Sequence, residues 1–255
     1  MKINKLNWFY MGLAFALLAA IIYQKLSYKS WERYNYSVGI TAPQTFPVHV
    51  REAYFLLPGD DFESADDEDV NEFITTWGVN YGTTNHARSA RLPQHLVLKY
   101  FSYRDKKFYA DTLALPQKEI LQMFKAAQIN EQFLRLSEYA GLKKGLSFVI
   151  GIANNGNVIV WLRGVCLERE LLRTQLKPVE STADDLFYEK PLSKDDYFNY
   201  AFENLSDSLK TVYISGFDAN ANYIDTPSRY IENNMELWQY QQKNGYIDFK
   251  GQISK

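Results

Sequence analysis

Cysteine is almost absent from this sequence: Cys166 is the one cysteine among 255 residues. A single cysteine excludes an intramolecular disulfide and every Cys-x-x-Cys metal or redox motif. Cys166 directly follows Trp161-Leu162-Arg163-Gly164-Val165, and no histidine or cluster of basic residues lies beside it to activate a thiolate. We therefore expect Cys166 to act as a small buried hydrophobic group at the end of a strand.

Positive charge is not in excess either, and histidine is scarce. The 28 Lys and Arg residues against 30 Asp and Glu residues give a net charge of −2, so the chain lacks the basic footprint of a nucleic-acid-binding protein. The histidines form no His-Glu-x-x-His motif and no pair with ligand spacing; they are His49, His86 and His95. We expect no nucleic acid, no metal and no cofactor as a partner.

The motifs of the common enzyme classes are missing as well. Ser147 stands in Gly-Leu-Ser-Phe-Val, which lacks the final glycine of a nucleophile elbow. Gly151 and Gly156 have the spacing of a phosphate-binding loop, but Asn157 and Val158 follow where Lys and Ser or Thr are needed. A pair of catalytic carboxylates stays open, because spacing cannot reveal one among 30 acidic residues. The prediction is a protein without catalytic residues.

One long apolar run is present near the N-terminus. Between Lys5 and Lys25 lie 19 uncharged residues. As a helix they would span about 28 Å, close to the thickness of a bilayer's hydrocarbon core. We predict a transmembrane signal anchor at residues 1–26, with residues 6–24 in the bacterial inner membrane. The alternative is a cleaved secretory signal, but Ala19 and Ala20 make no convincing cleavage site before large residues.

The rest of the chain is expected to follow that anchor on the outside of the inner membrane. A signal anchor leaves its N-terminus inside by default, although basic residues flank the apolar run on both sides. We therefore predict a short tether at residues 27–35 and a single periplasmic domain at residues 36–255. Its length is sufficient for a well-buried core.

The strongest structural signal lies at residues 148–164, where two runs rich in β-branched residues flank Asn154-Asn155-Gly156-Asn157. Asn-Gly tolerates positive φ, and the pattern predicts a β-hairpin. The sequence also predicts strands at residues 36–40, 46–55, 96–103, 107–113, 210–217 and 246–249, a strand or helical turn at 168–175, and helices at 116–127, 130–139, 193–205 and 228–243. Pro47 is expected to keep its strand at a sheet edge.

The order of these elements has no βαβ period. It favours an α+β fold, mainly an antiparallel β-sheet or sandwich with a few packed helices, preceded by one N-terminal transmembrane helix. Residues 70–90, with Trp77-Gly78 and His86, are expected to form a long surface connection.

Negative charge is concentrated in residues 58–72. This stretch contains no basic residue and carries Asp60, Asp61, Glu63, Asp66, Asp67, Glu68, Asp69 and Glu72. The register of an EF-hand is missing, so we expect a solvated loop or a short helix start rather than a calcium site. The same eight residues are the candidate partner-binding site, because such a stretch can steer a basic partner surface.

Several short motifs stand in a distinctive order: Trp31, Thr41-Ala42-Pro43, Phe46-Pro47-Val48-His49-Val50, Trp77-Gly78, Leu92-Pro93, Tyr100-Phe101-Ser102, Lys107-Phe108-Tyr109, Leu115-Pro116 and the run from Ile150 to Gly164. From Trp31 to Cys166 this order resembles the bacterial family called domain of unknown function 2931. The resemblance implies an exported envelope protein, often a lipoprotein, and for some members an immunity partner of a type VI secretion toxin. No lipobox cysteine follows the apolar run here, so the helix itself would be the anchor.

The leading hypothesis is a non-enzymatic, membrane-anchored periplasmic binding protein, specifically an immunity protein that neutralises a secreted toxin. The alternative is a structural envelope domain, or one whose aromatic residues bind glycan or peptide. The family supplies no catalytic residues to transfer to this chain.

Overall fold

The structure is a computed structural model that describes residues 4–65, 69–70, 76–79, 84–85, 89–137, 143–216 and 218–253. The chain divides into two compact units, Met1–Arg33 and Tyr34–Lys255, and each is described by itself.

The first unit is built on one long helix, α1 (Lys5–Tyr28). None of its residues is buried. The Asn4 side chain accepts a hydrogen bond from the Leu6 amide and caps the first turn. As the sequence predicts, α1 is long and apolar enough to cross a membrane, a test that a signal sequence also passes. The predicted tether is partly helical, because α1 continues to Tyr28 and a 3₁₀ turn, η1 (Ser30–Glu32), follows.

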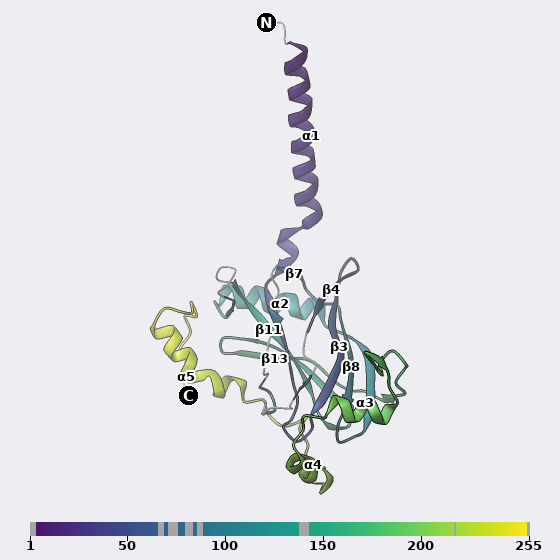
Figure 1. Ribbon diagram of the computed structural model, residues 1–255. Coiled ribbons are helices and arrows are strands. Elements are labelled where there is room, and N and C mark those ends of the chain that lie inside the picture. Colours follow the sequence, from purple (N-terminus) through teal and green to yellow (C-terminus); the bar gives the residue numbers. More distant parts are fainter. Residues whose placement is uncertain are drawn as a thin grey trace. The chain divides into compact units, whose positions relative to one another are not determined.

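The second unit contains two six-stranded β-sheets and four α-helices among its described residues. Several of these elements are labelled in Figure 1. The first sheet has the strand order β13 (Leu167–Gln175), β12 (Asn157–Gly164), β11 (Lys143–Ile152), β2 (Tyr36–Thr41), β6 (Thr84–Asn85), with β10 (Leu134–Ser137) also on β11. The second has the order β14 (Pro178–Val179), β9 (Lys107–Ala114), β8 (His95–Ser102), β3 (Val48–Leu57), β4 (Asp61–Ser64), with β5 (Asp69–Val70) also on β3.

The pairing in both sheets is antiparallel except between β2 and β11, which run parallel. The other described strands are short and form two two-stranded sheets: β1 (Arg33–Tyr34) with β7 (Ala90–Arg91), and β15 (Phe187–Tyr188) with β16 (Lys190–Pro191). The prediction of an α+β fold with mainly antiparallel sheets is confirmed.

The two sheets share one hydrophobic core. Alternate residues of β2, β11 and β12 in the first sheet and of β3, β8 and β9 in the second contribute buried side chains to one cluster. The helix α2 (Gln117–Ile129) adds Ile120, Phe124 and Ala127, the stripe that the sequence predicts. This shared cluster makes the architecture a sandwich.

Part of the outer face of each sheet is covered by a later part of the chain. On the second sheet, Phe101 and Phe108 pack with the helices α3 (Lys194–Ala201) and α4 (Asp207–Ile214) through Tyr197 and Tyr213. On the first sheet, β11 and β12 present an apolar face that contacts residues 223–253, including α5 (Tyr230–Lys243). Trp77 is buried there against Trp161, so it is not the surface residue that we expected.

The central hairpin is confirmed in detail. Ile152 of β11 pairs with Val158 of β12, and the register continues to Ser147 opposite Arg163. Asn155 and Gly156 both have positive φ, at 59° and 76°. Cys166 lies in the following turn rather than at the end of a strand, with φ 51° and its thiol half-buried. Burial raises the pKa of this thiol, which agrees with a structural role.

Two elements differ in type from the prediction. The helix expected at residues 130–139 is wrong in its described part, because Glu131 has a positive φ of 56° and Leu134–Ser137 form β10. The strand expected at residues 210–217 is wrong as well: Ser206 caps α4 by accepting from the Leu209 amide, and Tyr213 is buried against α3.

Three smaller expectations are also wrong. Residues 246–249 form no strand, because Ile247 instead packs on Trp238. Pro47 lies just before β3, a strand paired on both sides, so its missing amide removes no ladder bond. Residues 58–64 form the turn and second strand of a hairpin rather than a solvated loop or helix start. His86 lies outside the described residues.

Candidate functional site

A groove of about 630 Å³ lies beside the acidic hairpin of β3 and β4. Most of its apolar lining comes from side chains on the outer face of the second sheet, and the core residue Leu57 contributes as well. Leu56 is paired with Phe62 on β4 and with His95 on β8, so these three residues form one row across the sheet. Tyr54 packs edge to face on Phe62 with the ring centroids 6.1 Å apart.

The position of Phe62 is unusual for an aromatic residue. It lies on β4, which ends the strand order of its sheet, and 64% of it is exposed. A turn with positive φ at Gly59 and Asp60 fixes the hairpin that presents it. The result is an exposed aromatic ring over an apolar groove, with two carboxylates, Asp60 and Asp61, on the rim.

The structure brings together only part of the predicted acidic site. Asp60 and Asp61 line the groove, and Glu63 does not. Glu63 is paired with the core residue Phe55, so its side chain leaves β4 on the opposite face from Phe62.

The rest of the acidic stretch is not part of the described groove. Asp69 pairs with His49 at the far end of β3, whereas Asp61 pairs with Leu57. At the rise of a strand, these two positions are about 26 Å apart. The remaining predicted residues lie outside the described residues; they are Asp66, Asp67, Glu68 and Glu72. The described residues of the acidic stretch therefore do not form one patch.

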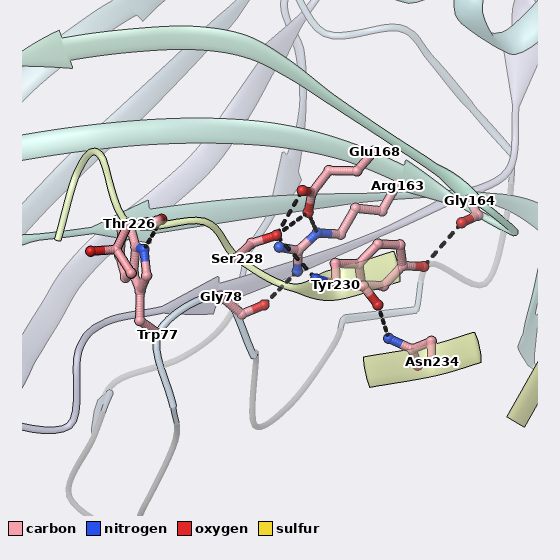
Figure 2. A network of polar contacts seen from close by, with 9 residues as sticks. All are labelled: Trp77, Gly78, Arg163, Gly164, Glu168, Thr226, Ser228, Tyr230 and Asn234. Carbon is pink, nitrogen blue, oxygen red and sulfur yellow. Dashed lines mark hydrogen bonds and ion pairs between the residues drawn. The ribbon is translucent and has the colours of Figure 1, made fainter. Parts of the chain in front are cut away.

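A second polar cluster is buried on the outer face of the first sheet, around Arg163 (Figure 2). The Arg163 side chain is 1% exposed, and its Nε donates to Oε2 of Glu168 at 2.7 Å. Its Nη1 donates to the carbonyl of Gly78 at 2.7 Å. The guanidinium also lies 4.5 Å from the ring centroid of Tyr230. Burial lowers the pKa of Arg163, and the Glu168 carboxylate opposes part of this shift.

This cluster ties the C-terminal segment to the sheet. The Ser228 hydroxyl donates to Glu168 at 2.6 Å, and the Tyr230 hydroxyl donates to the carbonyl of Gly164 at 3.2 Å. The indole of Trp77 donates to the carbonyl of Thr226 at 3.0 Å, as Figure 2 shows. Burial raises the pKa of Tyr230 well above its usual range. Three segments that are far apart in sequence thus meet at this ion pair: residues 77–78, 163–168 and 226–230.

Reasoning from sequence missed both Arg163 and the apolar half of the groove. The signal for Arg163 was alternation: Ile159, Trp161 and Arg163 share one face of β12, which indicates that the arginine enters an apolar environment. The signal for the groove was Phe62, an aromatic residue within an acidic run.

The described histidines and carboxylates show no metal centre. Among the described residues, no group of three or more His, Cys, Asp or Glu side chains is placed to hold a metal ion. His49 is buried in ring contacts with Tyr197 and Phe202, which fits the predicted role of a residue on a strand face.

Comparisons with known proteins identify the family of this chain. No curated protein and no solved structure matches the chain. The model of a family described as protein of unknown function (DUF2931) matches residues 23–217, about three quarters of the chain. The match extends well beyond the stretch from Trp31 to Cys166 on which the sequence resemblance rests. The chain belongs to the DUF2931 family.

Proposed function

We propose that this chain is a non-enzymatic, membrane-anchored binding protein of the bacterial periplasm, and that it acts as an immunity protein by neutralising a secreted toxin through stoichiometric contact. The observation that carries the proposal is the groove of about 630 Å³ beside the β3–β4 hairpin. An exposed aromatic ring beside apolar side chains, with charges on the rim, is typical of a protein-docking surface.

The chemistry of the groove suggests what the partner presents. Phe62, Leu56 and Tyr54 favour an apolar or aromatic side chain of the partner. Asp60 and Asp61 favour a Lys or Arg beside it, and their charges would speed association with a basic surface. Within the described residues, Asp60 and Asp61 form no ion pair, so their charges are available to a partner.

The proposed location rests on α1. Its apolar surface is unburied within the chain, so a bilayer is the environment that would cover it. With the N-terminus inside by default, the domain that follows α1 lies in the periplasm. Anchoring of that kind would hold an immunity protein where an incoming toxin acts.

The test is co-purification of the full chain, in detergent or nanodiscs, with each secreted protein encoded beside its gene. We expect a one-to-one complex with one of these proteins. Asp60→Asn combined with Asp61→Asn should slow association and weaken its salt dependence, and Phe62→Ser should speed dissociation.

Glu203→Gln combined with Glu236→Gln is the matched control, because it removes the same charge from exposed positions outside the groove. Equal effects of the two double variants would contradict the docking site. If no neighbouring secreted protein forms a complex, the immunity function is wrong, and the envelope glycan or peptide domain becomes the better explanation.

A further inference from the structure

A separate pocket of about 280 Å³ lies on the outer face of the first sheet, beneath α5. Its floor is formed by β2, β11 and β12, and its walls by β10 and α5. Ser37, Ser147 and Arg163 are register partners on the three floor strands, so they form one polar row. This pocket shares no residue with the groove beside Phe62.

The lining combines positive charge with apolar walls. Arg135 and Arg163 both line the pocket, and no acidic side chain is among the described residues that do. Half of the lining is aliphatic or indole surface, from Leu134, Leu136, Val149, Val165, Leu237, Trp238 and Ile247. The amides of Asn234 and Gln241 on α5 add neutral polar groups. Concave sites of this composition are typical of small-molecule pockets.

Arg163 has hydrogen-bonding capacity that its known contacts do not use. Its Nε and Nη1 donate to Glu168 and to the Gly78 carbonyl. Its Nη2 is buried and has no hydrogen-bond partner in the part of the chain that the structure describes. A buried donor without an acceptor is costly, so an acceptor oxygen brought by a ligand would be favourable here.

The ligand's charge follows from the same geometry. An anion suits a lining with two guanidinium groups and no carboxylate among its described residues, and a planar carboxylate matches the fork of an arginine. The Glu168 carboxylate already neutralises part of the positive charge of Arg163. The remaining charge suits a monoanion better than a dianion such as phosphate. The aliphatic and indole walls call for an apolar group attached to the acid.

We propose that this pocket binds the carboxylate of a small apolar acid, with Arg135 and the Ser37–Ser147–Arg163 row facing the carboxylate and the walls from β10 and α5 facing the apolar group. The acid is either a free molecule or the C-terminal residue of a peptide. Residues 230–247, which close the pocket, lie beyond the part of the chain that the family model matches, so the complete pocket depends on this C-terminal segment.

Calorimetric titration of the full chain in detergent tests the proposal with defined probes. The probes are 3-phenylpropionate, its neutral amide, inorganic phosphate, and N-acetyl-Ala-Phe with either a free or an amidated C-terminus. We expect 3-phenylpropionate to bind with a dissociation constant of about 1 mM or lower and its amide to bind at least about tenfold more weakly. If the dipeptide with a free C-terminus binds more tightly than 3-phenylpropionate, the natural ligand is the C-terminus of a peptide. If it binds more weakly, the natural ligand is a free acid.

Two variants locate the site. Arg135→Gln should weaken binding of the acid by about tenfold or more, whereas Arg169→Gln, on an exposed arginine of β13, should leave it unchanged. Ser147→Val removes a floor hydroxyl and keeps a residue suited to a buried strand, so the fold should survive while binding is lost. Thr174→Val on β13 is its matched control.

Each other outcome overturns the proposal. If none of the acids gives a heat of binding at a concentration about tenfold above the expected dissociation constant, the pocket binds no carboxylate. Equal binding of 3-phenylpropionate and its amide would show that the negative charge contributes nothing to binding. Tighter binding of inorganic phosphate would show that the ligand is a phosphate and not a carboxylate. Binding that persists unchanged in both Arg135→Gln and Ser147→Val would place the acid elsewhere.

Discussion

Tyr100 of β8 and Tyr109 of β9 stack in the core with their ring centroids 5.0 Å apart and their planes at 21°. They are register partners on adjacent strands, yet their hydroxyls differ. The Tyr109 hydroxyl donates to Oδ2 of Asp105 at 3.1 Å. The Tyr100 hydroxyl is buried and has no hydrogen-bond partner within the described residues. The pair therefore contains one satisfied and one unsatisfied buried hydroxyl.

Tyr100→Phe should stabilise the domain, because it removes a buried polar atom that has no partner among the described residues. We expect a gain of about 1 kcal/mol in the free energy of unfolding. Tyr109→Phe is the matched variant and should cost about 1 kcal/mol, since it removes the hydrogen bond to Asp105. Urea unfolding of the three proteins checks the signs. A loss of stability in Tyr100→Phe would show that its hydroxyl has a partner after all.

Alkaline pH should unfold the domain through its buried tyrosines. Burial raises the pKa of Tyr100, Tyr109 and Tyr230 above the ordinary value of 10.0. A group whose pKa is higher in the folded state gives its full stabilisation below its unfolded pKa, so stability should fall as the pH rises above about 10. Absorbance at 295 nm should show a late, cooperative phase that coincides with unfolding. Complete ionisation of all 19 tyrosines before unfolding would contradict this.

The parts of the fold that sequence predicted correctly are those with a strong local signal. The hairpin at residues 152–158 needs only Asn-Gly between β-branched runs, and its turn has the positive φ that this pair tolerates. The start of α3 needs only Ser193, which caps it by accepting from the Asp196 amide. Such signals act over a few residues, so they can be recognised without knowing which distant segments of the chain pack against them.

Tertiary contacts decided the elements that were predicted wrongly. Residues 211–214 are rich in β-branched residues, which favours a strand, but burial of Tyr213 against the aromatic residues around α3 selects a helix. Residues 134–137 form β10 rather than the expected helix because they pair antiparallel with β11, the strand that begins at Lys143. Propensity is a weak prior wherever packing of this kind intervenes.

The candidate sites depend even more on long-range placement. Asp61 and Glu63 are neighbours in sequence, but strand pairing places them in different surroundings, because only Asp61 lines the groove. Arg163 meets Gly78, Glu168 and, through Glu168, Ser228, which come from well-separated segments. The sequence predicted the acidic residues but not the role of Arg163, because only the fold shows which groups converge.

Gly156→Ala should destabilise the domain more than Gly216→Ala. Both glycines have positive φ, at 76° and 78°, so alanine is strained at each. A Cβ at Gly156 would also collide with the Leu176 carbonyl and the Tyr109 ring, whereas nothing among the described residues lies within 4 Å of a Cβ at Gly216. We expect losses of about 3 and about 1 kcal/mol, measured by urea unfolding. Equal losses would mean that backbone strain alone is responsible.

Glu168→Gln should be one of the most damaging single changes on the first sheet. It leaves the charge of Arg163, whose side chain is 1% exposed, without its partner, at a cost of about 3 kcal/mol. Glu170→Gln is the matched control, because its ion pair with Arg173 is 40% exposed on both sides and should change stability by less than about 0.5 kcal/mol. Similar unfolding midpoints for the two variants would show that the Arg163 pair contributes no more than a surface ion pair.

The full chain should stay in the membrane fraction through α1. Extraction with alkaline carbonate or high salt removes proteins held by surface charge, but it does not remove a helix whose apolar side chains lie in the hydrocarbon core. None of the residues of α1 is buried, so its apolar side chains are exposed to their surroundings. A variant in which a cleavable secretory signal replaces residues 1–26 is the control and should become soluble. Release of a product that begins after Tyr23 from the unaltered chain would instead identify α1 as a cleaved signal.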